Sequence, residues 1–404
     1  MKKSTVALTI ALGVLFYHPM LNGYYLPVQF YAPKMFLAEP RIQKDWLSSL
    51  DVTISEGATT HSLNNIGQRV PLLDIYGNHS INPMLHTIEP CSAHLPIINA
   101  TASLCARFRF NQTLFCAIQN YINGFFVSLF LPIRYLSIIW PQFIDCTDIS
   151  QTNTALAKEL GGFFNHYGLH KNKTSSVGVG DMVALIGRTW SLFSNPYLDF
   201  IDISAQMGLL LATSKQRNED RILSLPLGFD GHWGCLGAGD ISFGAFEWVT
   251  LGMHVDLIAF IPHNGDMYIK TNMSESGIIF LSKRSVRRFR LPQISSGIYI
   301  KADHFARGFS FTMAYTFTYQ GKTHLSLVGS HENHSSSSLL SHDTRFAHWY
   351  SSVMHCSLEY DFTSRTDIVG PRIGIFYDTP ISGKNIFLTP ALTGQVGIDI
   401  TWNF

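Results

Sequence analysis

The sequence predicts an all-β fold: a transmembrane, antiparallel, up-and-down β-barrel of about twelve strands, with long outer loops and short periplasmic turns. Three observations support this prediction. Apolar and polar residues alternate through most of the chain, which places them on opposite faces of strands. Apolar residues make up 46% of the chain and charged residues only 14%, against about 25% charged in typical soluble domains. Beyond the export-like start, however, no apolar run reaches the roughly 18 residues that a membrane-spanning helix requires.

The end of the chain carries the clearest alternation. One face of this predicted strand is formed by Val396, Ile398, Ile400, Trp402 and Phe404. In transmembrane barrels the last strand pairs with the first, so that no sheet edge is left in the hydrocarbon. A terminal strand of a soluble sandwich alternates in the same way, so this feature alone leaves that alternative open.

The start of the chain has the pattern of an export signal. Lys2 and Lys3 precede an apolar stretch over 6–16, and Pro19 ends it. The region near Gly23 lacks the usual small-residue cleavage pattern, and an uncleaved anchor helix is the alternative. We expect three regions: a signal peptide over 1–23, an N-terminal periplasmic segment over 24–44 and the outer-membrane barrel over 45–404.

Twelve segments alternate with period two between turn residues, and these are the predicted strands. In chain order they cover 46–55, 104–119, 125–138, 176–190, 198–212, 231–246, 249–261, 297–306, 309–320, 347–362, 372–379 and 395–404. Glycines inside these strands, such as Gly178 and Gly180, indicate bends or close packing in a curved wall.

The connections between the predicted strands alternate in length. Turns such as 194–196 and 307–308 are short, whereas the links over 214–230, 262–294 and 321–345 are long and polar. If the first strand starts on the periplasmic side, every long link falls on the outer side, which is the asymmetry of bacterial barrels.

With apolar faces toward lipid, the opposite faces line the lumen. The predicted pore-lining cations are Arg107, Arg109, Arg134, Lys301 and Arg372. The predicted pore-lining anions are Asp202, Asp240, Asp256, Asp303, Glu359, Asp361 and Asp399, together with Asp51. Facing charges across a waist select polar solutes by size and charge. The alternative is that these charges pair and fill a closed lumen, and the links around 64–100 and 155–170 are candidates for folding inward.

Other chemistry is weakly supported. His254 and Asp256 share one strand face, and His355 lies near Glu359, but this spacing specifies no proton relay. A nucleophile motif such as G-x-S-x-G is absent. The metal-site alternative rests on three loop histidines, His331, His334 and His342, for which a solvated loop is the simpler interpretation. We therefore expect no catalytic residue, no metal and no cofactor, and the net charge of +1 gives no sign of nucleic-acid binding.

With these features the chain resembles Gram-negative outer-membrane β-barrel proteins of the porin type. The specific marker is the ending "GQVGIDITWNF", similar to the C-terminal signal that the barrel-assembly machinery recognises, with Trp402 and Phe404 as its aromatic residues. It departs at Asp399, where the usual residue is glycine, and Gly397 stands two positions earlier. The resemblance implies a location in the outer membrane, with lipid and the assembly machinery as partners.

The expected function is a diffusion pore for small polar solutes or ions. One alternative is a plugged or gated barrel that transports apolar molecules, for which Phe115, Phe126 and Phe130 on the lumen parity are weak support. Another is a surface adhesion or structural barrel with long outer loops. A homo-oligomer is compatible with the sequence, but no residue pattern fixes an interface.

Overall fold

The computed structural model describes residues 48–72, 74, 79–81, 100–120, 124–145, 174–195, 198–220, 224–245, 248–269, 282–306, 308–328, 346–362 and 369–400. Strands dominate this part of the chain, and it contains no helix long and apolar enough to cross a membrane. The predicted regions 1–23 and 24–44, and the aromatic pair Trp402 and Phe404, lie outside the described residues.

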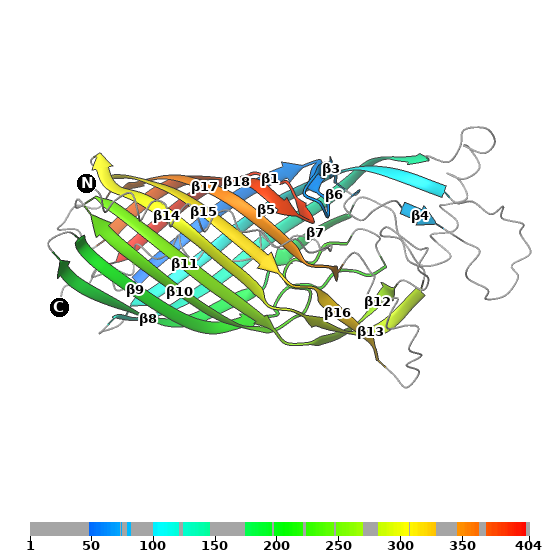
Figure 1. Cartoon of the computed structure of the whole chain (residues 1–404), viewed down its shortest axis with the longest axis horizontal. Coiled ribbons are helices and arrows are strands. Elements are labelled where there is room, and N and C mark those ends of the chain that lie inside the picture. The colour runs from blue at the N-terminus through cyan, green and yellow to red at the C-terminus, as the bar shows by residue number, and fades with distance from the viewer. Residues whose placement is uncertain are drawn as a thin grey trace, which may run out of the picture.

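A closed antiparallel barrel of twelve strands forms the body of the molecule (Figure 1). The main sheet has 14 strands, of which β4 (His79–Ile81) and β7 (Thr174–Val179) stand at the two ends of its order; pairing of β5 with β6 closes the other twelve into a ring. In ring order these are β1 (Ser48–Thr59), β5 (Ala100–Asn120), β6 (Phe125–Asp145), β8 (Met182–Asn195), β9 (Leu198–Leu211), β10 (Gly234–Ala245), β11 (Val249–Phe260), β14 (Gln293–Ala306), β15 (Phe309–Gln320), β17 (Trp349–Asp361), β18 (Val369–Lys384) and β20 (Ala391–Ile400). The predicted strand number is confirmed.

The barrel closes between its first and last strands, as the terminal alternation predicts. β20 pairs along its whole length with residues 48–57 of β1, with Leu50 opposite Ile398 and Val52 opposite Val396. These four apolar residues share the outward face, because residues directly opposite one another in an antiparallel pair point the same way.

The outward face is a band of exposed apolar side chains. On β15, Phe309, Phe311 and Met313 are exposed, whereas Ser310 and Ala314 on the opposite face are buried. Side chains elsewhere on this face are as exposed as Met207 at 67%, Ile375 at 62% and Ile54 at 61%. Soluble monomers rarely expose apolar patches beyond a few hundred Å², so hydrocarbon is the medium that fits this surface.

The predicted strand 176–190 is two strands separated by a bulge. β7 pairs with β6 from Ile133 onward and β8 pairs with β6 up to Phe130, and the register changes by one residue between them. Gly180 donates its N–H to the Pro132 carbonyl at 2.7 Å, and a Cβ on Gly180 would lie 2.8 Å from Arg134 Nη1. Only glycine fits there without displacement, which agrees with the bend predicted from the strand glycines.

Three barrel strands continue beyond the outer rim as a separate small sheet. β12 (His263–Ile269), β13 (Ser282–Arg290) and β16 (Thr323–Leu327) follow or precede β11, β14 and β15 after two-residue breaks at 261–262, 291–292 and 321–322. Figure 1 shows this extension past the wall at one end of the barrel. The sequence analysis assigned 262–294 and 321–345 to loops, and this assignment is wrong where β12, β13 and β16 lie. Proline at 262 and 292 cannot donate to a ladder, which explains the breaks at 261–262 and 291–292 and the assignment of 262–294 to a loop.

Two small cores sit at the outer end. Met267, Ile269, Val286 and Phe346 form a buried cluster on the inner side of the extension sheet. The other is the sheet of β19 (Ile386–Phe387), β2 (His61–Leu63) and β3 (Arg69–Pro71), whose Phe387 ring lies 5.3 Å from that of Phe108 on the barrel wall.

Candidate functional site: the lumen and its outer mouth

Most of the predicted pore-lining residues share the inward face of their strands. The strand register and burial place the following on that face: Arg134, Asp202, Asp240, Asp256, Lys301, Asp303, Glu359, Asp361, Arg372 and Asp399. Asp51 lies there too, buried opposite Gly397. Their placement makes the enclosed face polar and charged, in contrast to the apolar outer face.

Arg107 and Arg109 are the exceptions, and their placement differs from the prediction. Asp51 points inward and is opposite Cys116, so the even-numbered residues of β5 face the interior. Phe108 and Phe110 are accordingly buried, whereas both arginines are exposed on the outer face. The sequence analysis assigned the arginine face of this strand to the lumen, which placed Phe108 and Phe110 on the lipid face. Here Phe108 instead packs against Phe387 of the β2–β3–β19 sheet.

The same register corrects one of the three phenylalanines that were placed in the lumen as support for a barrel that transports apolar molecules. Phe115 has the outward parity of β5, whereas Phe126 and Phe130 are buried on the inward face of β6. Apolar inward side chains therefore exist, but on β6 and its neighbours.

A buried charge cluster spans the closure between β18, β20 and β1. We call Ser49, Asp51, Arg372, Gln395 and Asp399 the closure seam cluster. Arg372 donates to Asp51 Oδ1 at 2.5 Å through Nη2, to Ser49 Oγ at 3.0 Å, and through Nη1 to Asp399 Oδ2. Gln395 Nε2 donates to the same Asp51 oxygen at 2.7 Å. One guanidinium thus bridges two carboxylates across three strands through charge-assisted hydrogen bonds.

The absence of a side chain at Gly397 creates the room for this cluster. A Cβ at this position would collide with Asp51 Oδ1 and Arg372 Nε. The glycine that the sequence analysis noted as displaced from its usual position in the assembly signal therefore has a packing role here.

The wall opposite the seam holds carboxylates against hydroxyl groups. In a ring of twelve strands β11 lies six steps from β1, and β9 to β11 carry Asp202, Asp240 and Asp256. Ser191 hydrogen-bonds Asp202 and Ser295 hydrogen-bonds Asp256. This wall contrasts with the seam, where a guanidinium compensates the carboxylates.

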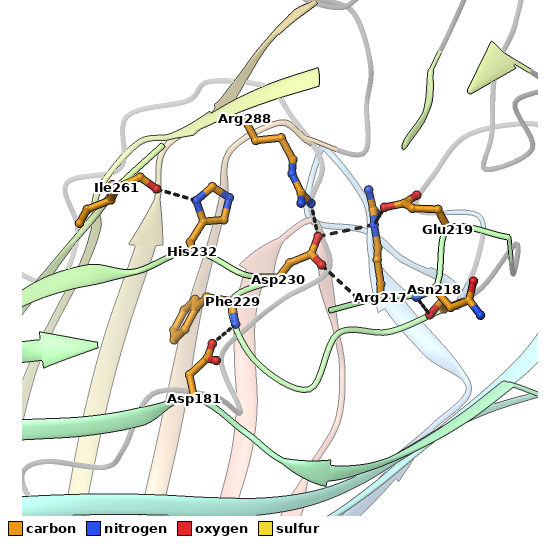
Figure 2. Close-up of polar contacts among 10 residues, drawn as sticks. Asp181, Arg217, Asn218, Glu219, Phe229, Asp230, His232, Ile261 and Arg288 are labelled. Atoms are coloured by element: carbon orange, nitrogen blue, oxygen red, sulfur yellow. Dashed lines mark hydrogen bonds and ion pairs between the residues drawn. The ribbon is translucent and has the colours of Figure 1, made fainter. Parts of the chain in front are cut away.

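A segment between β9 and β10 fills the outer mouth. We call residues 213–220 and 224–233 the mouth segment. Its side chains Leu227 and Phe229 are buried, and the Leu227 carbonyl accepts from Arg134 Nη1 at 2.6 Å. Asp181, in the bulge, accepts from Ser214 N at 3.0 Å. It also accepts from Phe229 N (Figure 2). The bulge thus turns one wall carboxylate toward the segment and anchors it at two points.

Asp230 joins the mouth segment to the extension sheet. Its carboxylate accepts from Arg288 Nη1 on β13 and from the backbone N of Arg217 at 3.1 Å, and lies 3.5 Å from Arg217 Nε (Figure 2). Burial alone raises the pKa of Asp230, but the charges of Arg217 and Arg288 outweigh it and hold the pKa below its ordinary value. The residue therefore stays ionised and holds the segment across the opening.

Neighbouring groups complete the mouth. His232 Nδ1 donates to the Ile261 carbonyl at 3.0 Å, and burial, followed by the charge of Arg290, lowers the pKa of His232 to about 3. The Arg290 guanidinium carbon lies 4.6 Å from the Phe260 ring centroid and 5.2 Å from that of Phe229, a cation–π arrangement.

The sequence analysis missed Asp181, Asp230 and Asp378. Asp378 has the inward parity of Arg372 and lies 2.6 Å from His355 Nδ1 on the neighbouring strand. It falls within the predicted strand 372–379, so parity along that strand was the signal that could have found it. Asp181 and Asp230 lie in a bulge and a loop, where period two does not apply. No group of three or more His, Cys, Asp or Glu with metal-binding geometry occurs among the described residues; His331, His334 and His342 lie outside them.

Comparison with known proteins gives a structural match but no match by sequence. No protein-family model matches the chain, and no curated protein matches it. An outer membrane channel from Pseudomonas putida F1 has a TM-score of 0.53 at 10% identity, over 93% of this chain and 99% of that one. The fold is that of an outer-membrane β-barrel.

Further structural neighbours have lower scores. The toluene transporter TbuX of Ralstonia pickettii gives a TM-score of 0.36 at 8% identity, over 94% of this chain and 96% of that one. The NanC porin gives 0.31 at 10% identity, over 72% and 94%. With the apolar outer band, the barrel fold places the chain in the outer membrane, as predicted.

Proposed function

We propose that this barrel is a diffusion pore for small polar solutes or ions. The observation that supports it is the charged inward face, which carries Arg134, Lys301 and Arg372 with a larger number of carboxylates. An apolar solute would desolvate these groups at a cost, whereas a hydrated ion or polar solute replaces water in their hydrogen bonds.

The charge balance of this face favours cations. Apart from Lys384 at the outer end of β18, the cations of the described barrel wall that face inward are the three just named. The inward carboxylates are Asp51, Asp202, Asp240, Asp256, Asp303, Glu359, Asp361, Asp378 and Asp399. A low-dielectric wall focuses the field of such an excess and raises the local concentration of cations.

Single-channel recording in planar bilayers tests this proposal. We expect discrete conductance steps in KCl, with a reversal potential under a salt gradient that shows K⁺ preferred over Cl⁻. Absence of conductance, under conditions where the barrel is shown to be folded by its heat-modifiable migration in gels, would contradict it.

A second candidate is a gated barrel for apolar molecules. The specific observation in its favour is the apolar part of the mouth, where Leu225, Leu227 and Phe229 are buried, together with Phe126 and Phe130 on the inward face of β6. This candidate predicts uptake of an aromatic hydrocarbon into proteoliposomes with no ion conductance. If neither ion conductance nor hydrocarbon uptake is detected, the remaining candidate is a surface adhesion or structural barrel. Deleting the outer loops and measuring cell contact would test that candidate.

Three accompanying proposals concern how the chain reaches and occupies the membrane. We infer an export signal over 1–23, recognition of Trp402 and Phe404 by the barrel-assembly machinery, and transport without catalysis. Deleting Phe404 should reduce the heat-modifiable, membrane-inserted fraction in cells. Cross-linking in membranes would reveal whether the barrel forms a homo-oligomer.

A further inference from the structure

Arg107 and Arg109 form an exposed pair on the outer face of the barrel. They are two residues apart on β5 and point the same way, because side chains of a strand repeat every two residues. Both side chains are exposed, and no hydrogen bond or ion pair joins either of them to another described residue. Exposed arginines on a lipid-facing wall need an anionic or aqueous environment.

Their height along the wall follows from the pairing of β5 with β6. On β6 the outward residues are apolar from Phe125 to Ile133, and Tyr135 follows. From Phe125 to Tyr135 a strand tilted by about 40° climbs about 25 Å, the height of the apolar band of such barrels. Arg109 lies opposite Ser137 and Arg107 opposite Ile139, about 5 and 10 Å further out by the same geometry. The headgroup layer of a bilayer begins at the top of the apolar band and is about 5 to 8 Å thick. The backbone of Arg109 therefore lies within this layer, and that of Arg107 lies about 2 to 5 Å beyond it, a distance that the long arginine side chain spans.

The surroundings of the pair are polar and contain one carboxylate. Asn111 is exposed on the same face, opposite Tyr135 and Glu56. On β1, Ala58 is the residue directly opposite Arg109, and Glu56 lies diagonal to that arginine. Arg107 is one step further along the strand and has no carboxylate opposite or diagonal to it on β1. The patch keeps an excess of positive charge with an amide donor beside it.

An arginine at the other rim is held differently. Arg188 on β8 stacks on the rings of Phe125 at 4.9 Å and Trp190 at 5.4 Å, near the turn end of β6. That guanidinium is satisfied by aromatic rings of the chain itself, whereas Arg107 and Arg109 present free donors to the outer headgroup layer.

We propose that Arg107 and Arg109 bind the phosphate groups of anionic lipid headgroups in the outer leaflet. Guanidinium and phosphate match in charge and in paired hydrogen-bond geometry. The lipid's acyl chains would lie along the apolar band directly below, so one lipid contacts both regions. This inference does not depend on which solute the lumen passes.

Titration of the full-length folded barrel in detergent micelles with bisphosphorylated lipid A tests the site. In low salt we expect Arg107→Gln with Arg109→Gln to weaken binding about 10- to 30-fold, the product of two surface charge contacts. Arg188→Gln is the matched control, since it removes an outward arginine from the other rim, and should leave the affinity unchanged. Heat-modifiable migration should be the same for all three proteins.

Two further titrants identify the ligand. Lipid A without phosphate should bind the unmodified barrel as weakly as bisphosphorylated lipid A binds the double variant. Inorganic phosphate should not compete at the concentration at which lipid A binds. Equal binding by the double variant, equal binding of the dephosphorylated lipid, or displacement by equimolar inorganic phosphate would each overturn the proposal.

Discussion

The closure seam and the outer mouth are both held by buried arginine–carboxylate contacts, but the central residue of the contact has the opposite charge in each. At the seam, one guanidinium lies between two carboxylates on strands that also pair along a continuous ladder. At the mouth, one carboxylate, Asp230, lies between Arg217 and Arg288, and it joins a segment outside the ladder to the extension sheet. The seam cluster therefore reinforces a wall that backbone hydrogen bonds already hold, whereas the mouth contacts are a main attachment of their segment. The mouth should open locally while the barrel stays closed.

The largest effect is expected at the seam, from Arg372→Met. This change leaves Asp51 and Asp399 buried without their cation, which costs about 3–5 kcal/mol. The temperature at which the folded band converts to the unfolded band in gels should fall. Adding Asp51→Asn and Asp399→Asn should restore most of the loss, because neutral groups of similar shape replace an uncompensated pair. Failure of this restoration would show that the cluster acts through packing.

Asp230→Asn should act on the mouth and spare the barrel. It leaves Arg288 without its carboxylate, whereas Arg217 keeps its contact with Glu219. The change shifts the segment toward the open state by about 3 kcal/mol. We expect larger or more frequent conductance steps, with unchanged heat-modifiable migration. Asp220→Asn is the control: its pair with Lys283 is well exposed and should contribute little. If Asp230→Asn lowered the band-conversion temperature as much as Arg372→Met does, the mouth would not open independently of the barrel.

His232 gives the mouth a smaller, pH-dependent contribution. Its pKa is lowered to about 3 in the closed mouth, whereas an exposed histidine titrates near 6.5. His232 therefore binds a proton in the open state but not in the closed state over this range. As pH falls below about 6.5, the equilibrium constant for closing the mouth decreases by up to about tenfold per pH unit. Burial also lowers the pKa of His263, whose ring is 5.8 Å away, so it adds in the same direction. Asp230 keeps its charge in this window, because its lowered pKa removes the ion pair only at still lower pH.

Recording at pH 7 and pH 5 measures this dependence. The unmodified channel should open more often at pH 5, and His232→Gln should respond less to pH. Identical responses of the two proteins would assign the pH effect to groups other than His232.

The smallest effect is expected on the wall opposite the seam. Asp202→Asn with Asp256→Asn removes two carboxylates held by hydroxyl groups, so no buried cation is left behind. We expect folding to be unchanged and the K⁺ over Cl⁻ preference to fall about twofold. The reversal potential in a KCl gradient measures this change, and an unchanged value would place the selective charges elsewhere in the lumen.

Period-two alternation predicted the wall well because it reports one physical constraint. Along most of β15 and β9 the outward positions meet hydrocarbon and the inward positions do not, so burial follows parity there. The observed bounds Phe309–Gln320 and Leu198–Leu211 lie within a residue of the predictions. The same constraint placed Arg372, Asp399 and Asp202 on the inward face.

Parity failed where a second layer changed the environment of a strand. Phe108 and Phe110 point inward because the β2–β3–β19 sheet covers them, and this moved Arg107 and Arg109 to the outer face. At Gly180 a bulge shifted the register by one residue and turned Asp181 toward the mouth. Neither event leaves a periodic signal, since each depends on segments distant in the chain.

The sequence by itself determined the number of strands, the two faces of most of them and the pairing of the first with the last, because hydrocarbon imposes the same demand on every outward residue. Only the tertiary structure decided which charges meet. Arg372 reaches Asp51 across a ring closed by residues more than three hundred positions apart, and Arg288 reaches Asp230 because the extension sheet lies over the mouth. Contacts of that kind depend on register and on loop placement, which an alternating pattern does not encode.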